Sequence, residues 1–99
     1  MSQGAIAKRY AQALFELGDE AGELNALSEQ ITDFAKTYSS HRELAVALTN
    51  PVMSHEEARS LLTAVAKKVG VSELGIRGLL VMAQRRRLPS IVATAERLS

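Results

Sequence analysis

Apolar residues recur along this chain at spacings of three and four, which is the period of an amphipathic α-helix. The clearest stripe carries Leu24, Leu27, Ile31, Phe34 and Tyr38 on one helical face. No stretch shows the sustained alternation of apolar and polar residues that predicts a half-buried strand. The pattern therefore predicts an all-α fold, a six-helix bundle with short connections. The length of 99 residues predicts a single domain over residues 1–99.

The starts of several predicted helices are marked by Ser followed three residues later by Glu, the capping-box pattern. Ser40 with Glu43 predicts the start of a short third helix, and Ser54 with Glu57 predicts the start of a fourth. Ser72 is the candidate N-cap of a fifth helix.

Gly, Asn and Pro mark the predicted ends of the helices. The candidates are Gly18 and Gly22 for a first helix over about residues 4–21, Asn50-Pro51 after the third helix, and Gly70 after the fourth. The fifth helix is expected to run to about Arg86, and Pro89 suits the first turn of a sixth. The apolar side of that sixth helix carries Ile91, Val92, Ala95 and Leu98.

The first and fifth predicted helices carry more apolar surface than one core contact requires, since a stripe of about 100° is enough to face a core. The polar residues of the first helix gather on one arc, which leaves about 200° of its circumference apolar. In the fifth helix only Arg77 and Gln84 form a polar strip between two apolar sides. Gly78 costs up to about 1 kcal/mol in a helix interior, which indicates that another backbone packs closely there.

Two interpretations of this excess follow. In one, both helices are central and surrounded on all sides. In the other, one side of each helix packs on the core and the other side lines a groove for an amphipathic helix from a partner. Because two fully enclosed helices are hard to arrange within 99 residues, we favour the groove.

Composition and charge exclude several classes of function. Apolar residues make up 46% of the chain and the net charge is +1, which indicates a globular protein with no global attraction to nucleic acid or anionic lipid. The chain has no Cys, so a disulfide framework and a thiolate metal site are excluded. No apolar stretch approaches the roughly 20 residues needed to span a bilayer, and no signal peptide is recognisable. We expect a cytoplasmic protein without direct membrane insertion.

The residues that could carry chemistry have simpler explanations. His41 and His55 each follow a Ser near a helix start, with no nucleophile or third metal ligand at a recognisable spacing. The cluster Arg85–Arg87 could bind nucleic acid, but consecutive residues on a helix point in different directions and form no flat basic face. We therefore expect no catalysis, no metal, no cofactor and no nucleic-acid partner. A different six-helix interaction module, similar to the death fold, remains the main alternative.

Four segments resemble, in order, the delta subunit of F-type ATP synthases, called the oligomycin-sensitivity-conferring protein in mitochondria. They are Ala7-Lys8-Arg9-Tyr10-Ala11-Gln12-Ala13-Leu14-Phe15-Glu16-Leu17, Leu48-Thr49-Asn50-Pro51, Leu79-Leu80-Val81-Met82-Ala83 and Arg87-Leu88. The resemblance implies the N-terminal six-helix domain of that subunit, a peripheral component on the cytoplasmic face of a bacterial inner membrane. It also implies a stator role, in which the domain helps to hold the catalytic head static during rotary, proton-driven ATP synthesis.

The same resemblance implies the partners and the site. The domain would bind the N-terminal helical segment of an alpha subunit in a groove between the first and fifth helices, and would be monomeric alone. The groove residues would be Ala7, Tyr10, Ala13, Leu14, Gly78, Val81, Met82 and Arg85. A C-terminal region, which this chain lacks, would join the b subunits of the peripheral stalk, so we expect a piece of a longer protein. Gln84-Arg85 departs from the acidic residue and Asn common in the family, so Arg85 and Arg86 add positive charge at this position.

Overall fold

The computed structural model describes residues 3–99, and every regular element in that range is helical, which confirms the all-α prediction. The elements are α1 (Gln3–Ala21), α2 (Leu24–Ser40), α3 (Arg42–Thr49), α4 (His55–Val69), α5 (Glu73–Gln84), the 3₁₀ helix η1 (Leu88–Ser90) and α6 (Ile91–Leu98). The six α-helices lie in the predicted order. Pro89 falls in η1, which leads directly into α6.

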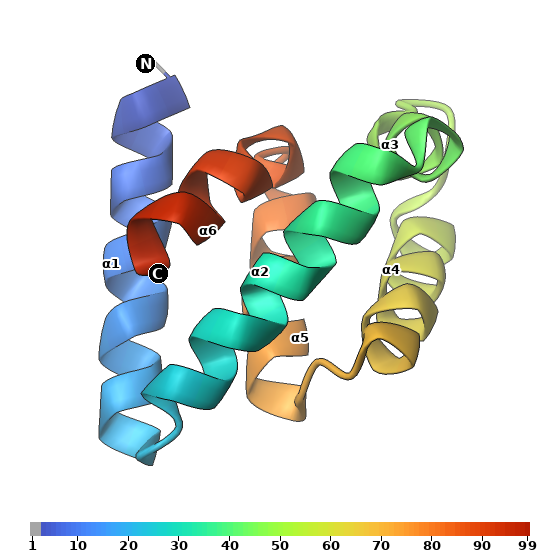
Figure 1. The fold of residues 1–99 in the computed structure, drawn as a ribbon. Coiled ribbons are helices and arrows are strands. Elements are labelled where there is room, and N and C mark those ends of the chain that lie inside the picture. The colour runs from blue at the N-terminus through green and yellow to red at the C-terminus, as the bar shows by residue number, and fades with distance from the viewer. Residues whose placement is uncertain (1–2) are drawn as a thin grey trace.

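The helices form a bundle in which α2 crosses the middle of the molecule (Figure 1). α6 packs across both α1 and α2, and α3 connects α2 to α4 at one end. α5 runs behind α2 in this view and contacts both α1 and α4. α1 therefore has α2, α5, α6 and the 3₁₀ helix η1 as neighbours.

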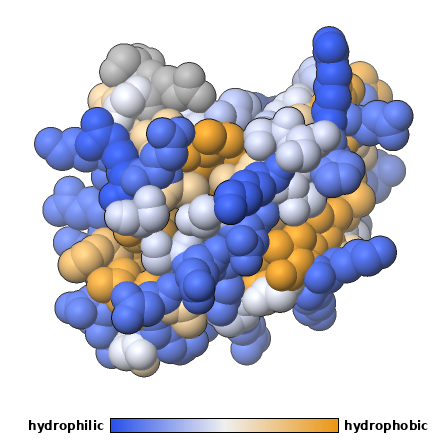
Figure 2. All heavy atoms as spheres, viewed as in Figure 1, coloured by the Kyte–Doolittle hydropathy of each residue, from blue (hydrophilic) through white to orange (hydrophobic). Residues whose placement is uncertain are grey.

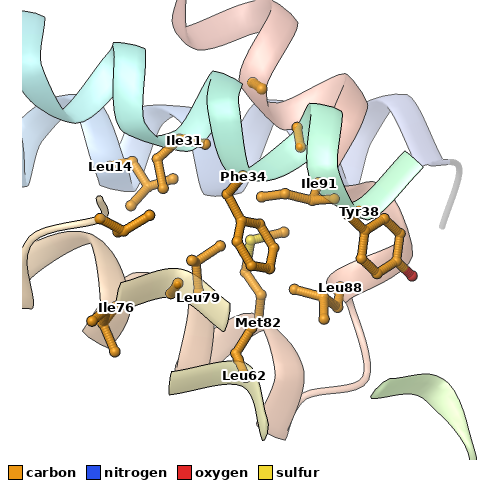
Figure 3. Packing of buried hydrophobic residues seen from close by; sticks show 14 of the residues in the cluster. Leu14, Ile31, Phe34, Tyr38, Leu62, Ile76, Leu79, Met82, Leu88 and Ile91 are labelled. Atoms are coloured by element: carbon orange, nitrogen blue, oxygen red, sulfur yellow. The ribbon is translucent and has the colours of Figure 1, made fainter. Parts of the chain in front are cut away.

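The stripe predicted on α2 supplies the centre of the core. Ile31 and Phe34 have no accessible surface, and Figure 3 shows the Phe34 ring among side chains that include Leu79, Met82 and Ile91. Full burial of such a side chain stabilises the fold by roughly 1.5–3 kcal/mol. The opposite side of α2 is polar, and Figure 2 shows it as a diagonal hydrophilic band with apolar surface on both sides. This amphipathic pattern explains why α2 lies where it does.

Three helices end in the same way, with one residue in the left-handed αL conformation. Gly22 after α1 has a φ of 70°, and Gly70 after α4 has a φ of 100°. α5 ends with Arg86 in this position, at a φ of 57°, and the Arg87 amide donates to the Met82 carbonyl at 2.7 Å. This is the Schellman arrangement, which usually employs Gly because a Cβ costs roughly 1–2 kcal/mol in αL. Arg86 is therefore a strained position at the end of α5.

Two boundary predictions are wrong. Ser40 and Glu43 form no capping box, because α2 continues through Ser40 and the N-cap of α3 is His41, which makes no side-chain capping bond. The backbone amide and Nδ1–H of His41 both donate to the Thr37 carbonyl, at 3.1 and 2.9 Å, so the last turn of α2 is closed by this residue instead. Gly18 is not a helix end but lies inside α1.

The other starts agree with the sequence more closely. The capping box of α4 is confirmed: the Glu57 amide donates to Ser54 Oγ at 3.1 Å, and the Ser54 amide donates to Glu57 Oε1 at 3.2 Å. Hydrogen bonds to the Glu57 carboxyl from the Ser54 hydroxyl and the Ser54 backbone amide hold the pKa of that carboxyl below its ordinary value. Ser72 is the N-cap of α5, but its side chain makes no capping bond, and its amide donates to Gln30 Oε1 at 2.9 Å. α5 ends at Gln84, slightly earlier than predicted.

Candidate functional site

The two helices predicted to form a groove are neighbours and run antiparallel (Figure 1). Leu27 of α2 packs against Gly18 near the end of α1 and against Gly75 near the start of α5. In the middle, Leu14 of α1 packs against Gly78 of α5, and a Cβ placed on Gly78 would lie 2.6 Å from Leu14 Cδ2. Gly78 therefore permits close packing as expected, but its neighbour is a side chain and not a second backbone.

Two rows of residues with the same spacing flank this contact. On α1 the row is Ile6, Tyr10, Ala13 and Leu17, and on α5 it is Leu74, Gly78, Val81 and Arg85. Successive members of both rows are four, three and four positions apart, so each row follows one side of its helix. Leu17 and Val81 keep 43% and 42% of their surface exposed, and Tyr10 and Leu74 are half-buried. These rows leave apolar surface open between α1 and α5.

The eight residues predicted for the groove divide into two groups. Ala7, Leu14 and Met82 are buried in the core, with 0%, 3% and 0% of their surface exposed. The others reach the surface, and they are Tyr10, Ala13, Gly78, Val81 and Arg85. The buried group lies beneath the open apolar surface between α1 and α5, and only the second group has exposed surface.

The structure adds two residues to the groove residues that the sequence analysis named. Leu17 extends the row on α1 by one turn, and Leu74 extends the row on α5 at the same end. Both belong to the apolar arcs that the helical period predicts, so the signal was present. What the sequence did not show is that α5 runs antiparallel to α1 with Gly78 beside Leu14, and that pairing brings Leu17 and Leu74 to one end.

The exposure of α1 bears on the two interpretations of its excess apolar surface. Phe15 keeps 48% of its surface exposed, and Leu17 and Val81 are also open. Neither α1 nor α5 is therefore enclosed on all sides. The groove interpretation fits this arrangement better than full burial does.

The remaining candidate groups do not assemble into a reactive site. His41 and His55 are both exposed, and they lie at the N-termini of different helices. Within residues 3–99 no group of three or more His, Asp or Glu side chains is placed to hold a metal ion. A hollow of about 300 Å³ between α4 and α5 is lined in part by His55, Arg59 and Leu80, and none of the predicted groove residues lines it. No helix among the described residues is long and apolar enough to cross a membrane.

Comparison with known proteins places this arrangement in a family. The family model described as "ATP synthase delta (OSCP) subunit" matches residues 6–99. Similar curated proteins, each called ATP synthase subunit delta, include those of Ruegeria sp. strain TM1040, Citrifermentans bemidjiense and Rhodobacter capsulatus. They are 36%, 31% and 39% identical over 94%, 97% and 85% of this chain, which correspond to 50%, 53% and 45% of the relatives. The chain spans about half the length of the curated relatives it matches.

Proposed function

Since the chain belongs to the ATP synthase delta (OSCP) subunit family, we propose that it is a non-catalytic domain of the peripheral stalk of an F-type ATP synthase. In this role it binds the N-terminal helical segment of an alpha subunit and helps to hold the catalytic head static while the rotor turns. The b subunits are bound through the part of the family's longer subunit that residues 1–99 do not span. The complex lies on the cytoplasmic face of a bacterial inner membrane, and residues 1–99 act there as one interaction domain.

The observation that carries this proposal is the open apolar surface between α1 and α5. Tyr10, Ala13 and Leu17 line one side, and Val81 lines the other. An amphipathic helix buries its apolar stripe in a surface of this kind, and the anchors recur at helical spacing. A stalk must hold under load, which requires slow dissociation, and a groove that is already formed avoids the cost of ordering the binding site.

The experiment is calorimetric titration of the domain with a synthetic peptide of the alpha-subunit N-terminus from the same genome. We expect binding by the unmodified domain and at least a tenfold loss of affinity for Val81→Asp, since the apolar contact is replaced by a charge that must be desolvated. Val92→Asp on α6 is the matched control, because Val92 is an exposed helical Val of similar exposure, 38% against 42%. It should bind as the unmodified domain does.

Two outcomes would contradict the proposal. The first is a domain with normal helical circular dichroism that does not bind the peptide at any concentration tested. The second is self-association by light scattering in place of peptide binding, which is what a death-fold-like module predicts. A monomer that binds the peptide and is sensitive only to the change at Val81 supports the stalk role.

A further inference from the structure

The hollow between α4 and α5 is separate from the α1–α5 groove and lies on the other side of α5. It has a volume of about 300 Å³ and is formed where the start of α4 meets the end of α5, since the two helices run antiparallel (Figure 1). Its apolar lining comes from Ala58, Leu80 and Ala83, which are half-buried. Pockets for small-molecule ligands measure roughly 300–1,000 Å³, so this hollow is at the lower limit. It suits one bulky side chain better than a whole drug-sized ligand.

The rim of the hollow lies beside an excess of positive charge. The polar residues that complete its lining are exposed, and they are His55, Glu56, Arg59 and Gln84. Arg85–Arg87 follow Gln84 directly, so their Cα atoms lie within about 11 Å of the Gln84 Cα atom at 3.8 Å per residue. Arg59 and these three arginines carry four positive charges, against the two negative charges of Glu56 and Glu57. The surroundings of the hollow therefore favour an anionic ligand.

Arg86 keeps a side chain at a backbone position where Gly would be easier to accommodate. Its φ of 57° places it in αL, and its side chain is exposed. Among residues 3–99, no side chain forms a hydrogen bond or an ion pair with its guanidinium group, so the fold has no contact that offsets this strain. Strained residues of this kind concentrate at functional sites. The strain favours a role for the Arg86 charge in binding a partner.

The surface beside the hollow also exposes an apolar side chain. Val52 keeps 88% of its surface exposed, the largest fraction among the exposed large apolar side chains. It precedes His55 of the rim by only three positions. Protein interfaces combine a pocket that receives an apolar anchor with exposed apolar residues and arginines around it. Because partners present complementary charge, the protein that fits this surface is acidic.

We propose that the hollow between α4 and α5 is a second docking site, which receives an acidic segment of a partner protein. One bulky apolar side chain of that segment fills the hollow against Leu80 and Ala83. Asp or Glu side chains on either side of this anchor pair with Arg59 and Arg86. Pairs between Arg and a carboxylate can be bidentate, which adds geometric specificity to the attraction. The site is independent of the α1–α5 groove and does not require an alpha-subunit peptide to be bound there.

The test uses three short synthetic peptides, titrated into the domain and followed by NMR. Peptide A has a central Phe with acidic residues on both sides, peptide B has Lys in place of every acidic residue, and peptide C has Gly in place of Phe. Peptide A should shift the amide signals of Ala58, Leu80 and Ala83. It should bind roughly tenfold more tightly than B or C at low salt, and the preference over B should shrink at high salt because salt screens exposed charges.

Three results of this titration would overturn the proposal. The first is an affinity for peptide A that is no higher than the affinity for B or for C. The second is a set of shifts confined to Tyr10, Val81 and their neighbours, which would place peptide A in the α1–α5 groove. The third is tighter binding of a short single-stranded DNA at the same signals, which would make the hollow part of a nucleic-acid site.

Charge changes at the rim test which side chains hold the ligand. Arg59→Glu should weaken peptide A roughly tenfold, because it places a like charge opposite the acidic residues. Lys36→Glu is the matched control, since it makes the same change in charge at an exposed residue of α2 outside the hollow, and it should leave the affinity unchanged. Glu56→Gln should strengthen peptide A by removing an opposing carboxylate. If Arg59→Glu and Lys36→Glu weaken peptide A equally, only net charge matters and the proposal is wrong.

Two further variants separate binding from folding. Arg86→Gly should raise the melting temperature by relieving the αL strain, and yet weaken peptide A. A higher melting temperature with unchanged affinity would overturn the pairing of Arg86 with the ligand. Ala83→Leu, which fills the hollow, should lose peptide A while keeping the circular dichroism of the unmodified domain and its affinity for the alpha-subunit peptide. Unchanged binding of peptide A by the folded variant would overturn the proposal, and Arg59→Glu decides it at an exposed position if Ala83→Leu does not fold.

Discussion

Replacing Gly78 by Ala sets two effects of similar size against each other at the contact between α1 and α5. Helix propensity alone favours Ala over Gly by about 1 kcal/mol in a helix interior. The structure opposes this gain, because the new Cβ would lie 2.6 Å from Leu14 Cδ2, about 1 Å inside ordinary contact. Leu14 keeps only 3% of its surface exposed and cannot swing into solvent.

The steric effect is expected to prevail. Adding a methylene to a packed core costs typically 1–3 kcal/mol, so Gly78→Ala should destabilise the domain by about 1 kcal/mol net. For a domain of this size that corresponds to a melting temperature about 4–8 °C lower. The measurement is chemical denaturation followed by circular dichroism, and affinity for the alpha-subunit peptide should fall too, because α1 and α5 are pushed apart.

The decisive control is the same substitution in a Leu14→Ala background. Leu14→Ala by itself should cost about 2–5 kcal/mol, because it removes a buried side chain and leaves space beside Gly78. With that space available, Gly78→Ala should become stabilising by about 1 kcal/mol. Gly4, a glycine of α1 with nothing within 4 Å of its Cβ position, should also tolerate Ala without loss. If Gly78→Ala has the same sign in both backgrounds, the Leu14 contact does not explain this glycine.

Three further predictions concern helix ends and buried groups. Arg86→Gly should stabilise the domain by roughly 0.5–1 kcal/mol in thermal melts, because it relieves the αL strain at the end of α5, and an unchanged melting temperature would argue against that strain. Ser54→Ala should cost about 1 kcal/mol at pH 7. The pKa of Glu57 is lowered in the folded state, so part of the stability that Ser54→Ala removes is present above the unfolded-state pKa of Glu57 and disappears as the pH falls through its folded-state pKa. Denaturation of the unmodified domain and of Ser54→Ala at low pH measures this dependence. Burial raises the pKa of Tyr38, so folding stability is lost as pH rises above 10, and Tyr38→Phe should remove that alkaline loss in melts at pH 8 and pH 11.

Helix faces, helix ends and one capping box were predicted correctly where the residues that determine them lie close together in the sequence. The stripe on α2 became the centre of the core because period-three and period-four spacing puts its residues on one face regardless of the rest of the fold. Gly22 and Gly70 ended their helices because αL is easily reached only without a Cβ. The box at Ser54 and Glu57 formed because both partners lie within one turn.

The same patterns were less informative where the chain made other contacts instead. Ser40 had the right neighbour in Glu43, but α2 continued through Ser40 and closed its last turn with His41. Ser72 is the N-cap of α5 as predicted, but its side chain makes no capping bond, and its amide donates to Gln30 of α2, a residue 42 positions away. Arg86 adopted αL without being Gly, because the chain must turn after α5 to bring buried Leu88 back into the core.

The sequence by itself determined which helices have more apolar surface than one core contact requires, because the helical period fixes which residues share a face. Their pairing was decided only in the tertiary structure, where Gly78 receives Leu14 and the two helices run antiparallel. The periodicity of one helix cannot report which side meets a neighbour, so Ala7, Leu14 and Met82 were assigned to a surface but lie beneath it. The packing of α4 against α5 also brings Arg59 and Gln84 to one hollow, because residues far apart in sequence come to share one site only when the helices pack.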